Sequence, residues 1–315
     1  MIDPLSLVTL AAVDRTGSVV AAAGELGYTP SAVSQQVKRL ERQVGASLLD
    51  RVGRGVMLTE LGRRLVVEGR PILDGLEHLE AGLLATDPDA PVVGRVRLAA
   101  FSTGIRGLVA PTLRDLIPTA PGLVVDIVEL DPHDAIDVVA RGSADAALVH
   151  NWGELTLPFP EHVEVVQLGS DVADVLVHRE HPMAGRPSVG AAELADDTWV
   201  CAPPGSVCHS WLIHMFDGHG NQPRIRHWAM EFGTQIGLVA EGLAVALVPR
   251  LGREHLPPEV VPVPVTDPRP IRRVMMTWRR SMAPSPAIQG LYAALSATAG
   301  ERLEQSAGPA KGALC

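Results

Sequence analysis

Residues 18–42, SVVAAAGELGYTPSAVSQQVKRLER, predict two short helices joined by a tight turn. Ser18 is a favourable N-cap residue, and Gly27 supplies the left-handed conformation that ends many helices. Thr29 can cap the second helix, and Pro30 suits its first turn because the N–H that proline lacks would be unpaired there. The stretch therefore predicts a helix-turn-helix.

The second helix has an apolar face formed by Val33, Val37 and Leu40 and a polar face opposite it. Short hydroxyls and amides on such a face can bind base edges, while cations bind phosphates. We therefore expect this helix to lie in the major groove of double-stranded DNA. The residues of this segment assigned to DNA binding are Thr29, Pro30, Ser31, Ser34, Gln35, Lys38 and Arg39.

Residues 48–58, LLDRVGRGVML, place two apolar runs around a glycine-flanked arginine, which is typical of a short β-hairpin. Arg51 and Arg54 would lie at its tip and could enter a minor groove, whose negative potential attracts guanidinium groups. A single surface arginine is usually only solvated. These two follow the helix pair directly, so the segment predicts a DNA-binding wing.

A long helix is expected next, because leucine or isoleucine recurs at sevenfold spacing beyond residue 58. Pro71 should bend this helix. The apolar row could pack on its own domain, but a seven-residue repeat favours a partner helix. We therefore predict a dimer seam made of Leu58, Leu65, Ile72, Leu76, Leu79 and Leu83.

The N-terminal region resembles the LysR-type transcriptional regulators, a bacterial winged helix-turn-helix family. That resemblance implies a DNA-binding protein that forms dimers, which assemble further into a homotetramer. It also implies that the protein senses a small-molecule effector and contacts RNA polymerase. Pro30 and Gln35 depart from the residues common in the family, so the operator sequence cannot be transferred from a relative. The resemblance rests on Ser18, Ala22, Ala23, Leu26, Gly27, residues 31–34, Gln36, Leu40, Glu41, Gly45, Leu48, Arg51, Arg54, Leu58, Thr59 and Gly62.

The charge is divided unevenly along the 315 residues, whose formal net charge is −9. Residues 1–70 carry nine Arg and Lys against seven Asp and Glu, whereas the remainder carries eighteen against twenty-nine. The basic charge is therefore local to the proposed DNA-binding region, and the acidic remainder disfavours contact with DNA.

The chain has no run approaching the roughly 20 apolar residues that span a bilayer, and its start lacks the pattern of a secretion signal. Three cysteines, Cys201, Cys208 and Cys315, fit a reducing compartment. We therefore expect a cytoplasmic protein that does not contact membranes.

Beyond residue 94, strands and helices alternate, which predicts sheets covered by helices. The expected architecture is a multidomain α+β and α/β protein whose C-terminal sensor has two α/β lobes and resembles periplasmic solute-binding folds. The predicted divisions are 1–58 for the winged helix-turn-helix, 59–86 for the dimerisation helix, 87–93 for a linker, 94–165 with 270–300 for lobe I, 166–269 for lobe II and 301–315 for a disordered tail.

Ligands of open α/β sheets bind beyond the carboxyl ends of strands, near helix N-termini. In the family, matching corners offer hydroxyls and backbone amides that often hold a carboxylate. Any residue chosen by this rule could equally be a helix cap or turn residue whose polar groups are satisfied locally. The effector residues predicted by this rule are Ser102, Thr103, His150, Asn151, Trp152, Gly205, Ser206, Phe232, Thr234, Val248 and Pro249.

Three alternatives remain beside this interpretation. Cys201 and Cys208 with nearby histidines could form a redox or metal sensor, although His209 and His214 would point about 140° apart on a helix and could not share one ion. A solute-binding protein would leave residues 1–58 without a purpose. Catalysis is disfavoured, because no nucleophile elbow, phosphate-binding loop or metalloprotease motif is present. We predict no metal, no cofactor and no catalytic residue.

Overall fold

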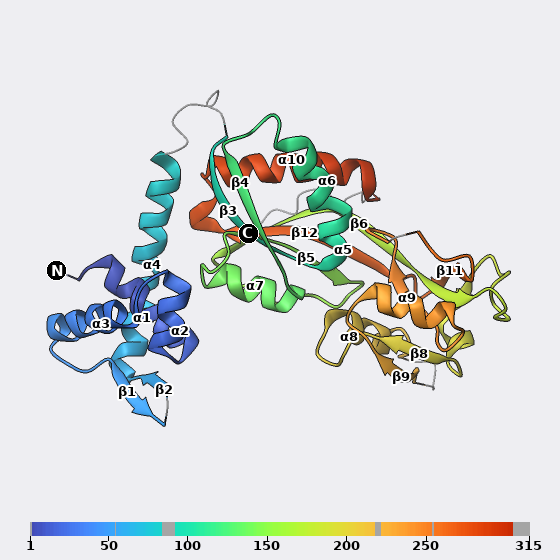
Figure 1. Cartoon of the computed structure of the whole chain (residues 1–315), viewed down its shortest axis with the longest axis horizontal. Coiled ribbons are helices and arrows are strands. Elements are labelled where there is room, and N and C mark those ends of the chain that lie inside the picture. The colour runs from blue at the N-terminus through green and yellow to red at the C-terminus, as the bar shows by residue number, and fades with distance from the viewer. Residues whose placement is uncertain (1, 54, 84–91, 218–221, 254, 305–315) are drawn as a thin grey trace, which may run out of the picture. The chain divides into compact units, whose positions relative to one another are not determined.

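The computed structural model describes residues 2–53, 55–83, 92–217, 222–253 and 255–304 (Figure 1). The chain divides into two compact units, Met1–Thr86 and Asp87–Cys315. Arg54, residues 87–91 of the predicted linker and residues 305–315 of the predicted tail lie outside the described residues.

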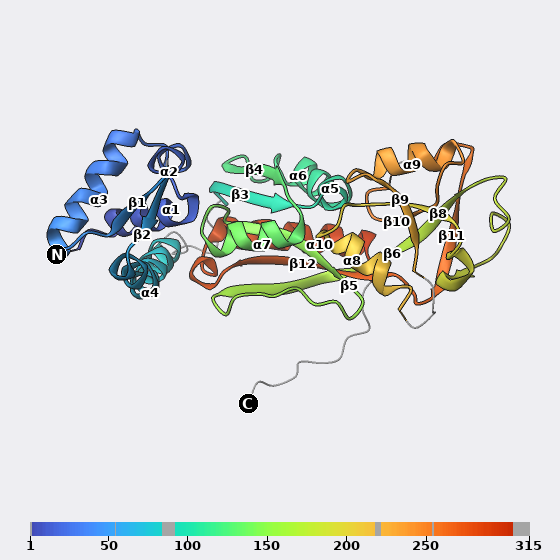
Figure 2. The ribbon, with the colours of Figure 1, turned by 90° about the horizontal axis from the view of Figure 1, so that it is seen from below.

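The N-terminal unit is a small helical domain with one β-hairpin, as predicted. Its core is formed by apolar residues of the first three helices and the hairpin, including Leu10, Val37 and Leu48. In Figure 2, α3 and α4 lie on different sides of this unit. Its elements are α1 (Pro4–Thr16), α2 (Val19–Leu26), α3 (Pro30–Val44), β1 (Leu49–Val52), β2 (Gly55–Leu58) and α4 (Glu60–Leu83).

The helix-turn-helix forms through the caps that the sequence predicts. The side chain of Ser18 accepts a hydrogen bond from the amide of Ala21, and that of Thr29 accepts one from Ala32. Gly27 ends α2 at a φ of 69°, a conformation that costs glycine little and other residues much more. These local bonds satisfy helix-end groups and set where α3 begins.

The structure of helix α4 shows that part of the predicted dimer seam was wrong. Leu58 is buried in the core of its own unit, and Leu65 packs against the same core. These two positions of the sevenfold row therefore serve intramolecular packing. The helix continues through Pro71. The remaining apolar side chains of the predicted seam are exposed, and they are Ile72, Leu76, Leu79 and Leu83.

The C-terminal unit contains an eight-stranded mixed sheet and a separate pair of parallel strands, β8 and β9. The main path of the large sheet has the order β4-β3-β5-β12-β6-β11-β7, and β10 also pairs with β6. The strands are β3 (Gly94–Ala100), β4 (Leu123–Glu129), β5 (Ala146–Trp152), β6 (Val163–His178), β7 (Val189–Gly190), β8 (Thr198–Cys201), β9 (Arg224–Trp228), β10 (Ala246–Pro249), β11 (Val260–Asp267) and β12 (Ile271–Arg279).

Helices cover both faces of this sheet (Figure 1). Helix α7 packs Ile136 and Val139 on one face, while α10 packs Leu291 and Leu295 on the other. Neighbouring strand residues point to opposite faces, so Ala99 and Leu98 enter different cores. The helical elements are α5 (Ser102–Gly104), the π-helical turn η1 (Ile105–Val109), α6 (Ala110–Leu116), α7 (Pro132–Ala140), the short turn η2 (Ala191–Leu194), α8 (Val207–His214), α9 (Phe232–Ala240), the short turn η3 (Arg280–Met282) and α10 (Pro286–Arg302).

Strand β6 joins the two parts of the C-terminal unit. Its first residues, through Val172, pair with β12, and from Ala173 onward it pairs with β10 and β11. The chain returns through β11 and β12, so two connections cross at this place. Helix α10 runs to Arg302 and Glu304 bridges to Ser170, which corrects the predicted tail at residues 301–304.

The close approach of α4 to the hairpin gives a stability prediction. A Cβ added at Gly62 would lie 2.5 Å from the carbonyl oxygen of Leu48, whereas one added at Gly75 of the same helix meets nothing within 4 Å. Gly62→Ala should lower the free energy of unfolding by about 1–3 kcal/mol. Gly75→Ala should raise it by up to about 1 kcal/mol, because alanine favours helix. Urea unfolding followed by circular dichroism measures both, and a stabilising Gly62→Ala would contradict the packing described.

Candidate nucleic-acid interface and effector cavity

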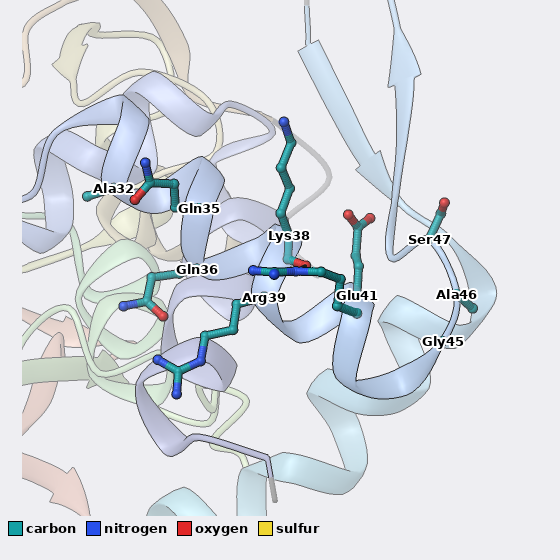
Figure 3. Close-up of a pocket in the computed structure, with 10 residues that line it drawn as sticks. Ala32, Gln35, Gln36, Lys38, Arg39, Glu41, Gly45, Ala46 and Ser47 are labelled. Carbon is teal, nitrogen blue, oxygen red and sulfur yellow. Dashed lines mark hydrogen bonds between the residues drawn. The ribbon is translucent and has the colours of Figure 1, made fainter.

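The exposed face of α3 and the turn that follows it form a groove of about 800 Å³ (Figure 3). Val33, Val37 and Leu40 are buried on the opposite side of the helix, so burial of the apolar stripe orients the polar face outward. Three predicted DNA-binding residues, Gln35, Lys38 and Arg39, lie together in this groove. The other residues that line it are Ala32, Gln36, Glu41, Arg42, Gly45, Ala46 and Ser47.

Several side chains of the groove are already engaged within the unit. The guanidinium of Arg39 lies 3.8 Å from the carboxylate of Asp3, and Glu41 accepts a hydrogen bond from the backbone amide of Leu48 at 2.9 Å. By contrast, the side chains of Gln35 and Lys38 have no hydrogen bond or ion pair within the described part of the chain. Figure 3 shows Lys38 and Arg39 pointing away from each other.

The other predicted DNA-binding residues lie outside this groove. Thr29 caps α3 and its hydroxyl lies 3.0 Å from that of Ser31, so both belong to the start of the helix, as does Pro30. Arg51 is exposed on the hairpin, and Arg54 lies outside the described residues. The DNA-binding assignment from the sequence did not include Gln36, whose side-chain oxygen accepts a hydrogen bond from Ser6 at 3.1 Å, or Ser47, although both line the groove. Ser47 follows the helix in a turn, where helical periodicity gives no signal.

The C-terminal unit contains a cavity of about 300 Å³. Five predicted effector residues line this effector cavity, namely Ser102, Thr103, His150, Ser206 and Phe232. They come from the starts of α5, α8 and α9 and from β5, so distant segments meet at one place. The remaining lining residues are Phe101, Glu129, Leu130, Asp131, Pro132, Asp134, Ala202, Cys208, Met230 and Arg272.

Six predicted effector residues do not line this cavity. His150, Asn151 and Trp152 were expected after a strand, but they form the end of β5 itself. Trp152 and Val248 are buried in apolar cores, and the side-chain oxygen of Asn151 accepts a hydrogen bond from the amide of Arg273. The complete set that the structure places away from the cavity is Asn151, Trp152, Gly205, Thr234, Val248 and Pro249.

Sequence reasoning missed Arg272, a fully buried cation at the inner end of the cavity. Its Nε donates to Asp171 at 2.8 Å and its Nη2 to the hydroxyl of Thr103 at 2.8 Å. The guanidinium also lies 5.0 Å from the ring centre of Phe101. Burial of a charge requires such a partner, so Asp171 compensates Arg272 inside the protein.

His150 is uncharged at neutral pH in this environment. Burial, followed by the nearby Arg272 cation, holds the pKa of His150 well below its usual range, because both disfavour the imidazolium. Its ring packs edge-on against Phe101 with the ring centres 4.5 Å apart. The Nδ1 atom is buried without a hydrogen-bond partner among the described residues.

The thiols of Cys201 and Cys208 do not have the environment of reactive cysteines. Burial raises the pKa of Cys201 to about 12 and also raises the pKa of Cys208. Both are free thiols. Within the described ranges, no three His, Cys, Asp or Glu side chains come together as a metal site requires. The chemistry of this region therefore favours packing over redox or metal sensing.

The fold and these two sites define a DNA-binding regulator made of a winged helix-turn-helix and an effector-binding α/β domain. Two family models match the chain. The model of the bacterial regulatory helix-turn-helix protein, lysR family, matches residues 5–63, and that of the LysR substrate binding domain matches residues 89–300. The chain belongs to the LysR family of transcriptional regulators.

Individual relatives agree with this assignment. The small neutral protease regulatory protein of Streptomyces coelicolor is 32% identical over 92% of this chain and 91% of its own. The uncharacterised regulator YnfL of Escherichia coli is 27% identical over 84% of this chain and 88% of its own. Among solved structures, a full-length OxyR variant from Pseudomonas aeruginosa has a TM-score of 0.72 at 22% identity, covering 94% of this chain and 98% of that one.

A further structural likeness is to full-length CbnR in complex with its target DNA, with a TM-score of 0.56 at 20% identity. It covers 94% of this chain and 99% of that one, and it supports the fold. Among the described residues, none of the helices combines the length and the apolar character needed to cross a membrane.

The thiol environment gives a prediction that separates packing from redox sensing. With a pKa of about 12, Cys201 should be a thiolate in only about one molecule in 10⁵ at neutral pH. In a Cys315→Ser background, Ellman's reagent should therefore label the native protein far more slowly than the protein in guanidinium chloride. Rapid labelling of the native protein, or a change in DNA affinity after mild peroxide treatment, would contradict this environment.

Proposed function

We propose that α3 enters the major groove, with Ser34 and Gln35 at base edges and Lys38 at a phosphate. The observation that carries this proposal is that Gln35 and Lys38 are exposed beside each other without internal partners among the described residues. An amide can read a base edge, and a lysine is a point charge suited to a phosphate oxygen. Arg51 and Arg54 of the wing are proposed to contact the adjacent minor groove.

The effector cavity is the proposed site of regulation. It is concave and combines apolar and aromatic walls with polar and charged side chains that could orient a small molecule. In this proposal, a bound effector changes the arrangement of subunits and thereby the contact with DNA and with RNA polymerase. The protein acts in the cytoplasm as a regulator and catalyses no reaction.

The exposed row of α4 is the proposed dimer contact. Ile72, Leu76, Leu79 and Leu83 are spaced four, three and four residues apart and so share one helix face. A second copy of α4 would bury them. Two α3 helices could then occupy successive major grooves about 34 Å apart, and two such dimers would form the tetramer.

Substitutions on α3 test the assignment of roles. Lys38→Ala should weaken binding to all duplex sequences similarly and lower the slope of affinity against salt by about one, because one phosphate contact is lost. Ser34→Ala and Gln35→Ala should change which sequences are preferred. The matched control is Arg64→Ala, which removes an exposed cation from α4, where it pairs with Glu68. Fluorescence anisotropy on a randomised duplex library, repeated over a range of salt, measures both quantities.

If Lys38→Ala altered the sequence preference and left the salt slope unchanged, the assignment of roles along α3 would be wrong. If the wild-type protein retained no duplex at low ionic strength, the DNA-binding proposal itself would fail.

A charge placed in the α4 row tests the dimer. Leu79→Glu should convert dimers to monomers at micromolar concentration and reduce DNA affinity, because a carboxylate would be buried at the seam. Val67→Glu is the control, since Val67 is the more exposed side chain at 71% and lies on the other side of the helix. Light scattering after size-exclusion chromatography gives the mass. A Leu79→Glu protein with the mass of the wild type would remove α4 from the interface.

A further inference from the structure

The outer end of the effector cavity carries three carboxylates. Glu129 and Asp134 are exposed, and Asp131 is partly buried beside them. None of the cations in the described part of the chain forms an ion pair with any of the three. Among the described residues that line the cavity, the one cation is Arg272, and it is already held by Asp171. The cavity therefore presents uncompensated negative charge to whatever enters it.

The start of α7 gives two of these three carboxylates a structural role. Asp131 is the N-cap of α7 and accepts a hydrogen bond from the amide of His133, and Asp134 lies in the first turn, where the helix dipole stabilises a carboxylate. Glu129 is the last residue of β4 and has neither role. Burial raises the pKa of Asp131, and the hydrogen bond from the amide of His133 offsets this only in part.

His150 gives a second, independent indication of a ligand. The side chain is 3% exposed and lines the same cavity, yet its Nδ1 has no hydrogen-bond partner among the described residues. A buried polar atom without a partner is costly unless a ligand or water satisfies it. Because the imidazole is neutral, a ring nitrogen without a proton can accept a hydrogen bond from an N–H donor.

The rest of the lining suits the carbon skeleton of a small organic molecule. Phe101 and Phe232 contribute aromatic rings, and Met230 adds a flexible apolar side chain at the open end. Aromatic faces also attract cations. The cavity thus combines apolar walls, an unpaired imidazole nitrogen and a rim of carboxylates.

We propose that the effector is an organic amine or guanidine whose cationic nitrogen is bound by Glu129, Asp131 and Asp134, with His150 accepting a hydrogen bond deeper in the cavity. This inference rests on the proposed function, because it names the ligand class of the same cavity. This ligand class differs from a purely anionic effector, because the charge that selects the molecule is positive whether or not it also carries a carboxylate.

Four five-carbon compounds that differ only in their end groups test whether the cavity selects positive charge. Cadaverine carries two ammonium groups, 5-aminopentanoate one ammonium and one carboxylate, glutarate two carboxylates, and pentane-1,5-diol no charge. Thermal shift and calorimetry on the full-length protein at low salt should show binding of cadaverine and 5-aminopentanoate that is at least tenfold tighter than that of glutarate or the diol. The preference should weaken as salt screens the rim. Benzylamine should likewise bind better than benzoate.

Replacing a carboxylate at the outer end of the cavity by its neutral amide tests whether that carboxylate binds the amine. Asp134→Asn and Glu129→Gln should each weaken amine binding about threefold to fivefold, as expected for exposed ion pairs, and leave the diol unaffected. The control is Asp137→Asn, which removes a carboxylate from the same helix where it pairs with Arg141 and does not line the cavity. Asp131 is left intact, because it caps α7.

Tighter binding of glutarate than of the amines, amine binding that the two rim variants leave unchanged, or no binding of any amine at millimolar concentration would each overturn this inference. Gel retardation of duplex DNA by the same preparations distinguishes a wrong ligand class from a wrong proposed function. Retention of DNA without amine binding removes the ligand class alone, whereas failure to retain DNA removes the proposed function.

Discussion

The C-terminal unit depends on one buried ion pair, Arg272 with Asp171. One oxygen of Asp171 accepts hydrogen bonds from the amides of Val172 and Leu251, at 2.9 and 3.0 Å, while the other accepts from Arg272. Arg272 also donates to Thr103. The pair is stable because every one of these groups is satisfied, and loss of either partner would leave a buried charge at a cost of about 3–5 kcal/mol. Four segments that are remote in sequence are thereby held at fixed positions.

Charge is distributed unevenly along the chain. Lys38, which has no ion pair among the described residues, lies on α3 within residues 1–70, whose net charge is positive, while the remainder of the chain is acidic. A polyanion such as DNA is therefore attracted more strongly to residues 1–70 than to the acidic remainder of the chain. Within the acidic unit, neutralisation of Arg272 by Asp171 leaves the three rim carboxylates to set the electrostatic potential of the cavity.

The features that could be predicted from the sequence are those formed by local interactions. The caps Ser18 and Thr29, the glycine that ends α2 and the buried stripe of α3 act within one or two turns, so the helix-turn-helix and the hairpin could be assigned without a structure. A sevenfold row is less informative, because burial within a subunit and burial between subunits need the same spacing. Leu58 and Leu65 are buried within their own subunit, whereas Leu79 is exposed and available for contact with a second subunit.

Residues of the effector cavity were harder to predict, because sheet topology brings them together. Arg272 lies 169 residues from its partner Thr103, and no local pattern relates the two. Strand β5 extends through Trp152 because Arg272 pairs with Trp152 and Val274 with His150 across to β12. The residues expected in a loop after β5 are therefore fixed in the sheet, with alternate side chains on opposite faces. His150 accordingly reaches the cavity while Asn151 does not.

The position of the ion pair also explains how occupancy of the cavity can affect the rest of the unit. Asp171 immediately precedes the point at which β6 changes partners from β12 to β10 and β11, and Arg272 lies at the start of β12, on the returning connection. Both crossings between the two parts of the sheet thus meet at this pair. A ligand that contacted Thr103 or Arg272 would therefore contact the residues at which the two connections cross. Hydrogen bonds through Thr103, Arg272, Asp171 and the amide of Leu251 thus connect the lining of the effector cavity to these crossings.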